Sequence, residues 1–189
     1  LISIKKSRIN TINDFSNKKI MTTIDDSSEV ALKAMIISKK VKVEDLNFLK
    51  HTHNINDLFN KNTDVIYAYI SKAPFQLNQK SVEYNIFDPK KFGFDMYSDM
   101  LYTSENLINS DLNTVLLFKK ASLKGWEYAY SNIQESANLI YEKYNSEKLT
   151  KDELIYEGTK LKKLSYFKTA KIGEIKKDKI QRIYDLYNL

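Results

Sequence analysis

The residues best suited to chemistry form a short acid–aromatic cluster, Asp95, Tyr97 and Asp99. Two neighbouring carboxylates are common equipment for general acid–base catalysis. The stretch Met96–Tyr102 alternates with the two-residue period of an extended strand, which would point both carboxylates the same way, about 7 Å apart. This geometry favours hydrogen bonding to a polar or cationic ligand group or to the local backbone, and the catalytic acid–base pair is the alternative.

A second polar cluster, Asp25–Ser28, joins a predicted buried strand to a predicted helix that begins near Glu29. Its side chains are all of the types that accept a backbone N–H at a helix N-cap, and Glu29 adds an acid to the first turn. Unpaired N–H groups at such a turn bind anions or polar ligands. The alternative is a capped helix without a ligand.

Two tyrosines, Tyr69 and Tyr97, are predicted at strand ends beside polar residues. A binding role and a satisfied buried hydroxyl explain each equally well. His51 and His53 form an H-x-H pair, but no H-E-x-x-H motif or acidic cluster accompanies them, so we expect polar surface residues and no metal site.

The sequence lacks several motifs that would indicate an enzyme. It has no cysteine and only four glycines. Thiolate chemistry, a G-x-S-x-G nucleophile elbow and a phosphate-binding glycine loop are therefore excluded. We expect no catalytic residue, no cofactor and no metal.

Composition indicates an ordinary globular protein of 189 residues, 42% hydrophobic and 29% charged. No run approaches the roughly 18 apolar residues of a membrane span. The net charge of +6 comes from lysine pairs scattered among acids, whereas nucleic-acid binders concentrate their charge on one face, so nucleic acid is not an expected partner. The chain starts at Leu1 without a methionine or a signal peptide, and we expect it to be a segment of a longer protein.

The first half of the chain predicts alternating strands and helices. Such alternation is typical of a parallel sheet with right-handed crossovers, which binds ligands beyond the carboxyl ends of its strands. Those ends are expected at Thr22–Thr23, at Tyr69–Ser71 and after Phe87. The predicted strands are Leu1–Lys5, Lys18–Thr23, a strand within Val43–Lys50, Asp64–Ser71 and Val82–Phe87.

The second half has helical spacing almost throughout. Gly125 lies inside one predicted helix, where glycine costs about 1 kcal/mol relative to alanine, so we expect close packing at that position. The predicted helices are Asp111–Ser131, Ile133–Tyr144, one that starts with a capping box at Thr150, and Asp178–Tyr187.

Four stretches together resemble one protein family: INTINDFSNKKI (Ile9–Ile20), FDPKKFGFDMYSDMLYTS (Phe87–Ser104), FKKASLKGWEYAYSN (Phe118–Asn132) and KIGEIKKDKIQRIYDLY (Lys171–Tyr187). The family is that of the extracytoplasmic solute-binding proteins of the alkanesulfonate, nitrate and thiamine-pyrimidine-precursor type. The chain is most similar to the branch that serves as the sensory module ahead of histidine kinases and diguanylate cyclases.

The resemblance implies an α/β fold of the type II periplasmic-binding kind, with two lobes that close on a small molecule. Residues 18–92 would form a complete α/β lobe, and residues 1–17 and 93–189 would form crossing strands and a mostly helical, partial first lobe. Family members carry a β-α-β portion before the position of Leu1. Without it, the helices are expected to expose apolar surface, to pair with another copy of the chain, or to pack differently.

By position, the resemblance also implies ten ligand-facing residues: Thr22, Thr23, Asp25, Ser27, Ser28, Tyr69, Ser71, Phe75, Asp95 and Tyr97. It implies non-catalytic binding of a small solute in a periplasmic or other extracytoplasmic location. The partner would be a downstream membrane-anchored kinase or cyclase module, or an ABC permease. One branch of the family makes the thiamine pyrimidine with a cysteine-rich iron site, which a chain without cysteine cannot build. The alternative to solute binding is an enzyme, either a synthase of that type or one that uses Asp95 and Asp99 as an acid–base pair.

Overall fold

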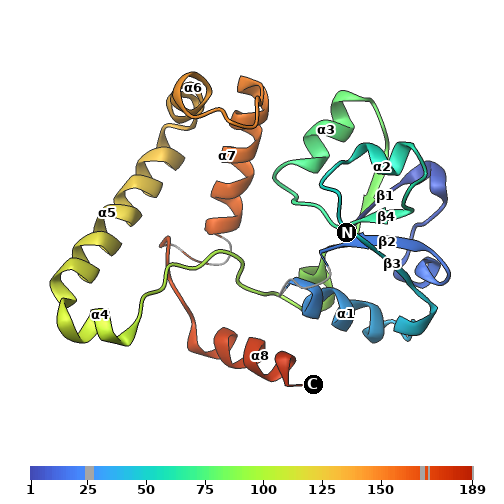
Figure 1. The fold of residues 1–189 in the computed structure, drawn as a ribbon, viewed down its shortest axis with the longest axis horizontal. Coiled ribbons are helices and arrows are strands. Elements are labelled where there is room, and N and C mark those ends of the chain that lie inside the picture. Colours follow the sequence, from blue (N-terminus) through green and yellow to red (C-terminus); the bar gives the residue numbers. More distant parts are fainter. Residues whose placement is uncertain (24–27, 167–168, 170, 189) are drawn as a thin grey trace. The chain divides into compact units, whose positions relative to one another are not determined.

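The structure, a computed structural model, describes residues 1–23, 28–166, 169 and 171–188. The chain divides into two compact units. The α/β unit comprises residues 1–98 and 176–189, and the helical unit comprises residues 99–175. Figure 1 shows the sheet with its helices in the first unit and a succession of helices in the second. The expected fold class, an α/β unit followed by a mostly helical part, is confirmed.

One mixed five-stranded sheet forms the centre of the α/β unit, with the strand order β3-β2-β4-β1-β5. β2 pairs in parallel with β3 and with β4, whereas β1 pairs antiparallel with β4 and with β5. The expectation of a wholly parallel sheet is therefore wrong for β1. The strands are β1 (Ile2–Ile4), β2 (Lys19–Thr22), β3 (Asn47–Lys50), β4 (Val65–Ile66) and β5 (Tyr84–Ile86).

The reversed direction of β1 follows from the connection after it. A parallel neighbour requires a long crossover, usually an α-helix. The segment between β1 and β2 contains only two short 3-10 helices, Lys5–Ser7 and Ile12–Phe15, and it turns the chain back in the opposite direction. As a result β2, β3, β4 and β5 all run one way and end at the same edge of the sheet.

Both faces of the sheet are covered by helices. In β2, Ile20 packs into a core cluster with Met35 of α1 (Ser28–Ser38), while Met21 packs into a second cluster. That second cluster contains Leu58 of α2 (Asn56–Phe59) and Leu77 of α3 (Ala73–Gln79). Neighbouring residues buried on opposite faces are characteristic of a parallel strand at the centre of an α/β sheet. Figure 1 shows α1 on one side of the sheet and α2 and α3 on the other.

The C-terminal helix α8 (Lys177–Tyr187) also belongs to the α/β unit, where it packs against α1. Two further short 3-10 helices complete the unit, Val43–Asp45 before β3 and Pro89–Phe92 after β5. The second of these ends at Gly93, whose φ of 93° is in the left-handed region that favours glycine.

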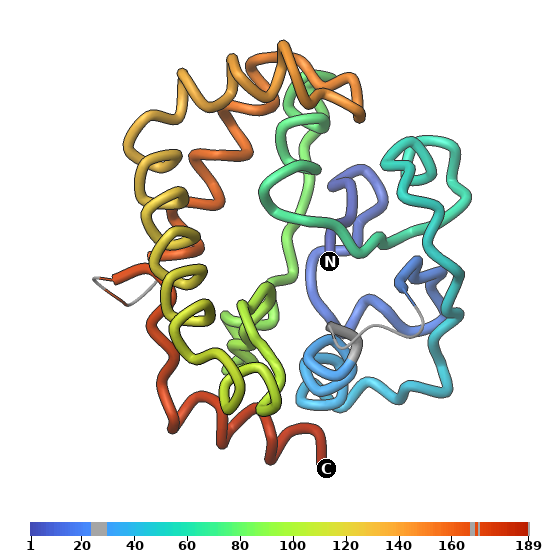
Figure 2. The backbone as a smooth tube through the Cα atoms, turned by 60° about the vertical axis from the view of Figure 1, so that its left-hand side comes forward, coloured from blue at the N-terminus to red at the C-terminus, as the bar shows by residue number. Residues whose placement is uncertain are grey.

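In its described residues the helical unit contains four successive helices, traced in yellow-green to orange in Figure 2: α4 (Glu105–Ser110), α5 (Leu112–Ser131), α6 (Ile133–Lys143) and α7 (Lys151–Ser165). The predicted capping box at Thr150 is confirmed, since its side chain accepts from the Glu153 N–H and the Glu153 carboxylate accepts from the Thr150 N–H. α4 was not predicted. Its signal is the N-cap Ser104, whose side chain accepts from the Leu107 N–H.

Two predictions about extended backbone are wrong. The structure assigns no strand to the described residues Met96–Tyr102, which follow an irregular path. Period-two alternation makes a strand only where a ladder partner exists. The run Asp64–Ser71 forms a ladder only at Val65–Ile66. Beyond Ile66 the Tyr67 N–H still donates to Met21 O, but the chain then turns into α3.

The prediction of close packing at Gly125 is also wrong. A Cβ atom at this position would meet no atom within 4 Å in the described structure. Gly173 is tightly packed instead, since a Cβ there would lie 2.8 Å from the Leu123 side chain and the residue has φ +75°. Among the described helices, none has both the length and the apolar character needed to cross a bilayer.

Candidate functional site

The carboxyl edge of the sheet brings together segments that are far apart in the sequence. Because β2, β3 and β4 run in the same direction, His51, Thr22 and Tyr67 follow one another along this edge, in the strand order β3-β2-β4. Thr22 O accepts from the His51 N–H at 3.0 Å. This hydrogen bond continues the β2–β3 ladder to the last residue of β2.

His51 links two of these segments through both ring nitrogens. Its Nε2 lies 2.6 Å from Tyr67 O, and its Nδ1 lies 2.7 Å from the backbone nitrogen of His53. A carbonyl only accepts and a backbone N–H only donates, so Nε2 carries the proton and Nδ1 accepts. The imidazole thus fixes the distance between the ends of β3 and β4.

A row of aromatic rings follows from this arrangement. The ring centroids of His53 and His51 are 4.5 Å apart, those of His51 and Tyr67 are 6.3 Å apart, and those of Tyr67 and Tyr69 are 5.9 Å apart. Tyr69 ends the row with 59% of its surface exposed. An exposed large apolar ring next to polar backbone ends is a feature of small-molecule sites, which combine aromatic walls with few polar groups.

The loop that carries the two histidines is anchored by Asp57, which is buried at the start of α2. The Thr52 hydroxyl donates to its carboxylate, and the Asn62 amide donates to it at 2.7 Å. The hydrogen bond from Thr52, followed by that from Asn62, holds the pKa of the Asp57 carboxyl below its usual value of 3.8.

This carboxylate makes the α/β unit sensitive to acid. A pKa lowered by folding means that the unfolded chain takes up the proton first, so the contribution of Asp57 is complete above the ordinary carboxyl pKa and is lost as the pH falls below it. We expect the urea midpoint of the wild type to fall between about pH 5 and pH 3 more steeply than that of Asp57→Asn or Thr52→Val. Equal slopes for the three proteins would contradict this assignment.

Five of the ten predicted ligand residues lie near the ends of β2 and β4 and at α3. Thr22 is buried and Thr23 is half-buried at the end of β2, and Tyr69 is exposed after β4. Ser71 is buried just before α3, and Phe75 is half-buried inside it. Asp25 and Ser27 lie outside the described residues. α1 begins at Ser28, whose side chain is also outside the described part.

Asp95 and Tyr97 are brought together by a residue that the sequence did not suggest. The ammonium of Lys179, on α8, lies 3.0 Å from Asp95 Oδ2 and 4.1 Å from the centroid of the Tyr97 ring. The Lys176 N–H donates to the Tyr97 hydroxyl at 3.0 Å. Lys90 approaches the other Asp95 oxygen at 3.6 Å. Asp95 is therefore the centre of a small charged cluster.

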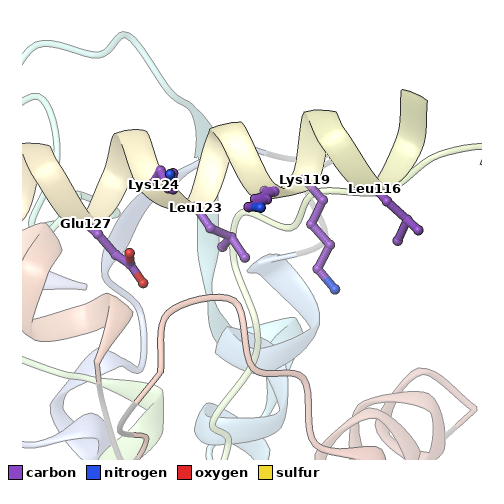
Figure 3. Close-up of a pocket in the computed structure, with 6 residues that line it drawn as sticks. Leu116, Lys119, Leu123, Lys124 and Glu127 are labelled. Carbon is purple, nitrogen blue, oxygen red and sulfur yellow. The ribbon is translucent and has the colours of Figure 1, made fainter. Parts of the chain in front are cut away.

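Two surface hollows of the described residues are lined by other residues. One of about 300 Å³ lies along α5, and Figure 3 shows Leu116, Lys119, Leu123, Lys124 and Glu127 on this helix. Another lies at the opposite edge of the sheet from the candidate residues, next to Lys5 and Tyr84. The described residues contain no group of three or more His, Asp or Glu side chains that could hold a metal ion.

Sequence reasoning missed three participants: Tyr67, the bridging role of His51, and Lys179. The first two had a detectable signal, because both directly follow the strands β3 and β4. The third had none. Lys179 is 84 positions from Asp95 and looks like any other lysine of an amphipathic helix.

Comparisons with known proteins give a consistent assignment. No curated protein matches the chain. A similar solved structure is described as the periplasmic sulfonate-binding protein SsuA of a sulfonate ABC transporter from Methylobacillus flagellatus KT. The TM-score is 0.57 at 11% sequence identity, and the match covers 100% of this chain but 66% of that one. At this identity the likeness concerns the fold alone, and it confirms the expected fold, that of a periplasmic binding protein.

The family comparison covers most of the sequence. The family model described as "NMT1/THI5 like" matches residues 1–136. This range contains the whole sheet, all the candidate residues from Thr22 to Tyr97, and the stretch around Trp126. The chain therefore belongs to the NMT1/THI5-like family of solute-binding proteins.

Proposed function

We propose that this protein binds a small solute without chemical conversion, at the carboxyl edge of its sheet. The observation that carries the proposal is the common direction of β2, β3, β4 and β5. It gathers the end of β2, the His51–Tyr67 bridge and the exposed Tyr69 at one edge, which is where open α/β sheets bind ligands. Family membership supports a binding role.

The wider role proposed for the protein is extracytoplasmic. It would act as the solute-binding component of an ABC transporter, or as the sensory module of a membrane-anchored kinase or cyclase. In both cases solute binding favours one conformation, and the partner responds to that conformation. The structural likeness to a protein described as periplasmic and sulfonate-binding supports the location. Permease genes beside the coding sequence, or a membrane helix with a kinase or cyclase encoded downstream, would separate the two roles.

No observation favours the enzyme alternative. Asp95, the proposed acid or base, is ion-paired with Lys179 and Lys90, which suits electrostatic recognition better than proton transfer. The absence of cysteine excludes a cysteine-rich iron site in this sequence.

The test is binding of a panel of sulfonates, pyrimidines, amines and carboxylates, followed by thermal denaturation and calorimetry. A ligand of the native state at about 100 times its Kd stabilises by about 2.7 kcal/mol, so a true solute raises Tm measurably. If no compound of the panel shifts Tm or produces a calorimetric signal at millimolar concentration, the binding proposal fails.

Tyr69→Ala tests the location of the site. Tyr69 is exposed, and the hydrogen bonds from Lys72 and Ala73 go to its backbone carbonyl, so the truncation leaves the core and the start of α3 in place. We expect the variant to keep the wild-type Tm and to bind the identified solute about two- to tenfold more weakly, since one aromatic contact is worth about 0.5–1.5 kcal/mol. The matched control is Tyr184→Ala on α8, also exposed, which should bind like the wild type.

A further inference from the structure

The cluster around Asp95 has the geometry of a binding site for an ammonium group. A carboxylate oxygen at 3.0 Å and an aromatic face at 4.1 Å contact the same nitrogen, Lys179 Nζ. A cation within about 6 Å of a ring centroid is attracted by the ring quadrupole, and aromatic faces of this kind recognise organic ammonium ligands. The Lys179 side chain is only 13% exposed, so most of it is withdrawn from water.

Asp95 also has unused capacity to accept a hydrogen bond. Its Oδ1 atom is shielded from solvent, yet no donor of the described residues reaches it within hydrogen-bond distance. The nearest cation, Lys90 Nζ, remains at 3.6 Å. Buried carboxylate oxygens are nearly always hydrogen-bonded, so an oxygen in this state is suited to an additional N–H or N⁺–H donor.

We propose that Asp95 and Tyr97 form a site for the organic ammonium group of a solute, and that Lys179 is a built-in occupant which such a solute must displace. The inference rests on the proposed solute-binding function and names the chemical class of the group bound. Lys179 supplies the same chemistry as the ligand, a primary ammonium at the end of a flexible alkyl chain. The site therefore selects a cationic group that can contact both the Asp95 carboxylate and the face of the Tyr97 ring, and it excludes anionic groups.

The occupant links the site to the position of α8. Lys179 and the Lys176 N–H both attach this helix to the Asp95–Tyr97 segment. A solute that takes the place of Lys179 removes the ion pair and the ring contact together, which loosens the start of α8. Because such coupling is reciprocal, a change that detaches Lys179 and α8 from Asp95 raises the affinity for the solute.

Removal of the occupant should uncover the site. A tethered group competes at an effective concentration of the order of millimolar or higher, so the wild type binds a free amine with reduced apparent affinity. We expect Lys179→Gln to bind n-butylammonium chloride at least about tenfold more tightly than the wild type, as measured by calorimetry at constant ionic strength. Butan-1-ol, which has a similar chain without the charge, should bind neither protein.

Matched variants separate the site from general effects of charge. Lys177→Gln makes the same change on an exposed residue of the same helix and should bind n-butylammonium like the wild type. Lys179→Arg keeps a cationic occupant, so its affinity for n-butylammonium should also stay as low as that of the wild type. Asp95→Asn added to Lys179→Gln should abolish the gain. The proposal is overturned if Lys179→Gln binds n-butylammonium no more tightly than Lys177→Gln, or if Asp95→Asn leaves the gain intact.

Two further measurements distinguish a binding site from a structural ion pair. In the Lys179→Gln background, Tyr97→Phe should retain amine binding and Tyr97→Leu should lose it, because the ring face and not the hydroxyl contacts the ammonium. In the wild type, n-butylammonium should speed hydrogen exchange of the α8 amides, which a purely structural pair would not show. Circular dichroism confirms that each variant is folded.

The outcome also separates this inference from the proposed function. A solute whose binding depends on Tyr69 supports the function by itself. If such a solute binds but Lys179→Gln binds n-butylammonium no more tightly than the wild type, the ammonium site is refuted and the proposed function is not.

Discussion

Phe15→Ala is expected to lower the free energy of unfolding of the α/β unit by about 3–5 kcal/mol, the usual cost of deleting a fully buried aromatic side chain. Phe15 is 0% exposed, and its ring meets that of Phe87 edge-on with centroids 4.9 Å apart. It fills the cluster between the sheet and α1, beside Ile20 and Met35. Truncation leaves a cavity. The surrounding side chains fill it only in part, because the sheet and α1 hold them in place.

Urea denaturation followed by far-UV circular dichroism measures this effect. The control is Ile37→Ala on α1, which is 57% exposed and should change the free energy of unfolding by no more than about 0.5 kcal/mol. A loss below about 1 kcal/mol for Phe15→Ala would mean that the ring is not part of a packed core. Because Phe87 directly follows β5, loss of the Phe15 ring should also loosen the edge of the sheet where we place the solute.

Leu77→Ala should cost about 2–5 kcal/mol on the opposite face of the sheet. Leu77 is 0% exposed and packs in the cluster that contains Met21 and Ile66. Leu77→Met conserves volume and should cost less than about 1.5 kcal/mol. Asn78→Ala, at the adjacent exposed position of α3, should be nearly neutral.

The Leu77 variant has a second expected result, in binding. α3 follows Ser71 and carries Phe75, so a loosened helix misplaces both candidate residues. At a temperature where the variant is still folded, we expect its affinity for the solute to fall while that of Asn78→Ala does not. An unchanged affinity would indicate that Ser71 and Phe75 do not contact the solute.

Much of the α/β unit is predictable from local pattern. β2 and the helix after it follow from a buried β-branched run, a polar turn and helical spacing, and α7 follows from its capping box. The end of β4 could not be predicted in this way. Most side chains of Asp64–Ser71 are β-branched or aromatic and favour extended backbone, but a ladder ends where its neighbour ends, and β2 stops at Thr22.

The acid–aromatic cluster shows a different limit. Alternation predicts a strand over Met96–Tyr102, and a strand would set the two carboxylates side by side. The actual conformation depends on Lys176 and Lys179, which join Tyr97 and Asp95 from the far end of the sequence. A contact between residues so distant in the chain leaves no periodic signal. The sequence predicts a polar or cationic ligand group or local backbone as the partner of Asp95, and it gives no sign of the intramolecular Lys179. The ten candidate residues as a ligand site, and the boundaries of the lobes, remain predictions.

The reversed strand β1 has a consequence for the order of folding. Ile2 pairs with Ile66 on one side and with Ile86 on the other, so β1 must wait for partners that are synthesised well after it. Pairing across such sequence distances slows folding, because the closure entropy of a long loop is lost before the ladder forms. We therefore expect β1 to enter the sheet last, between β4 and β5, which are both synthesised after it.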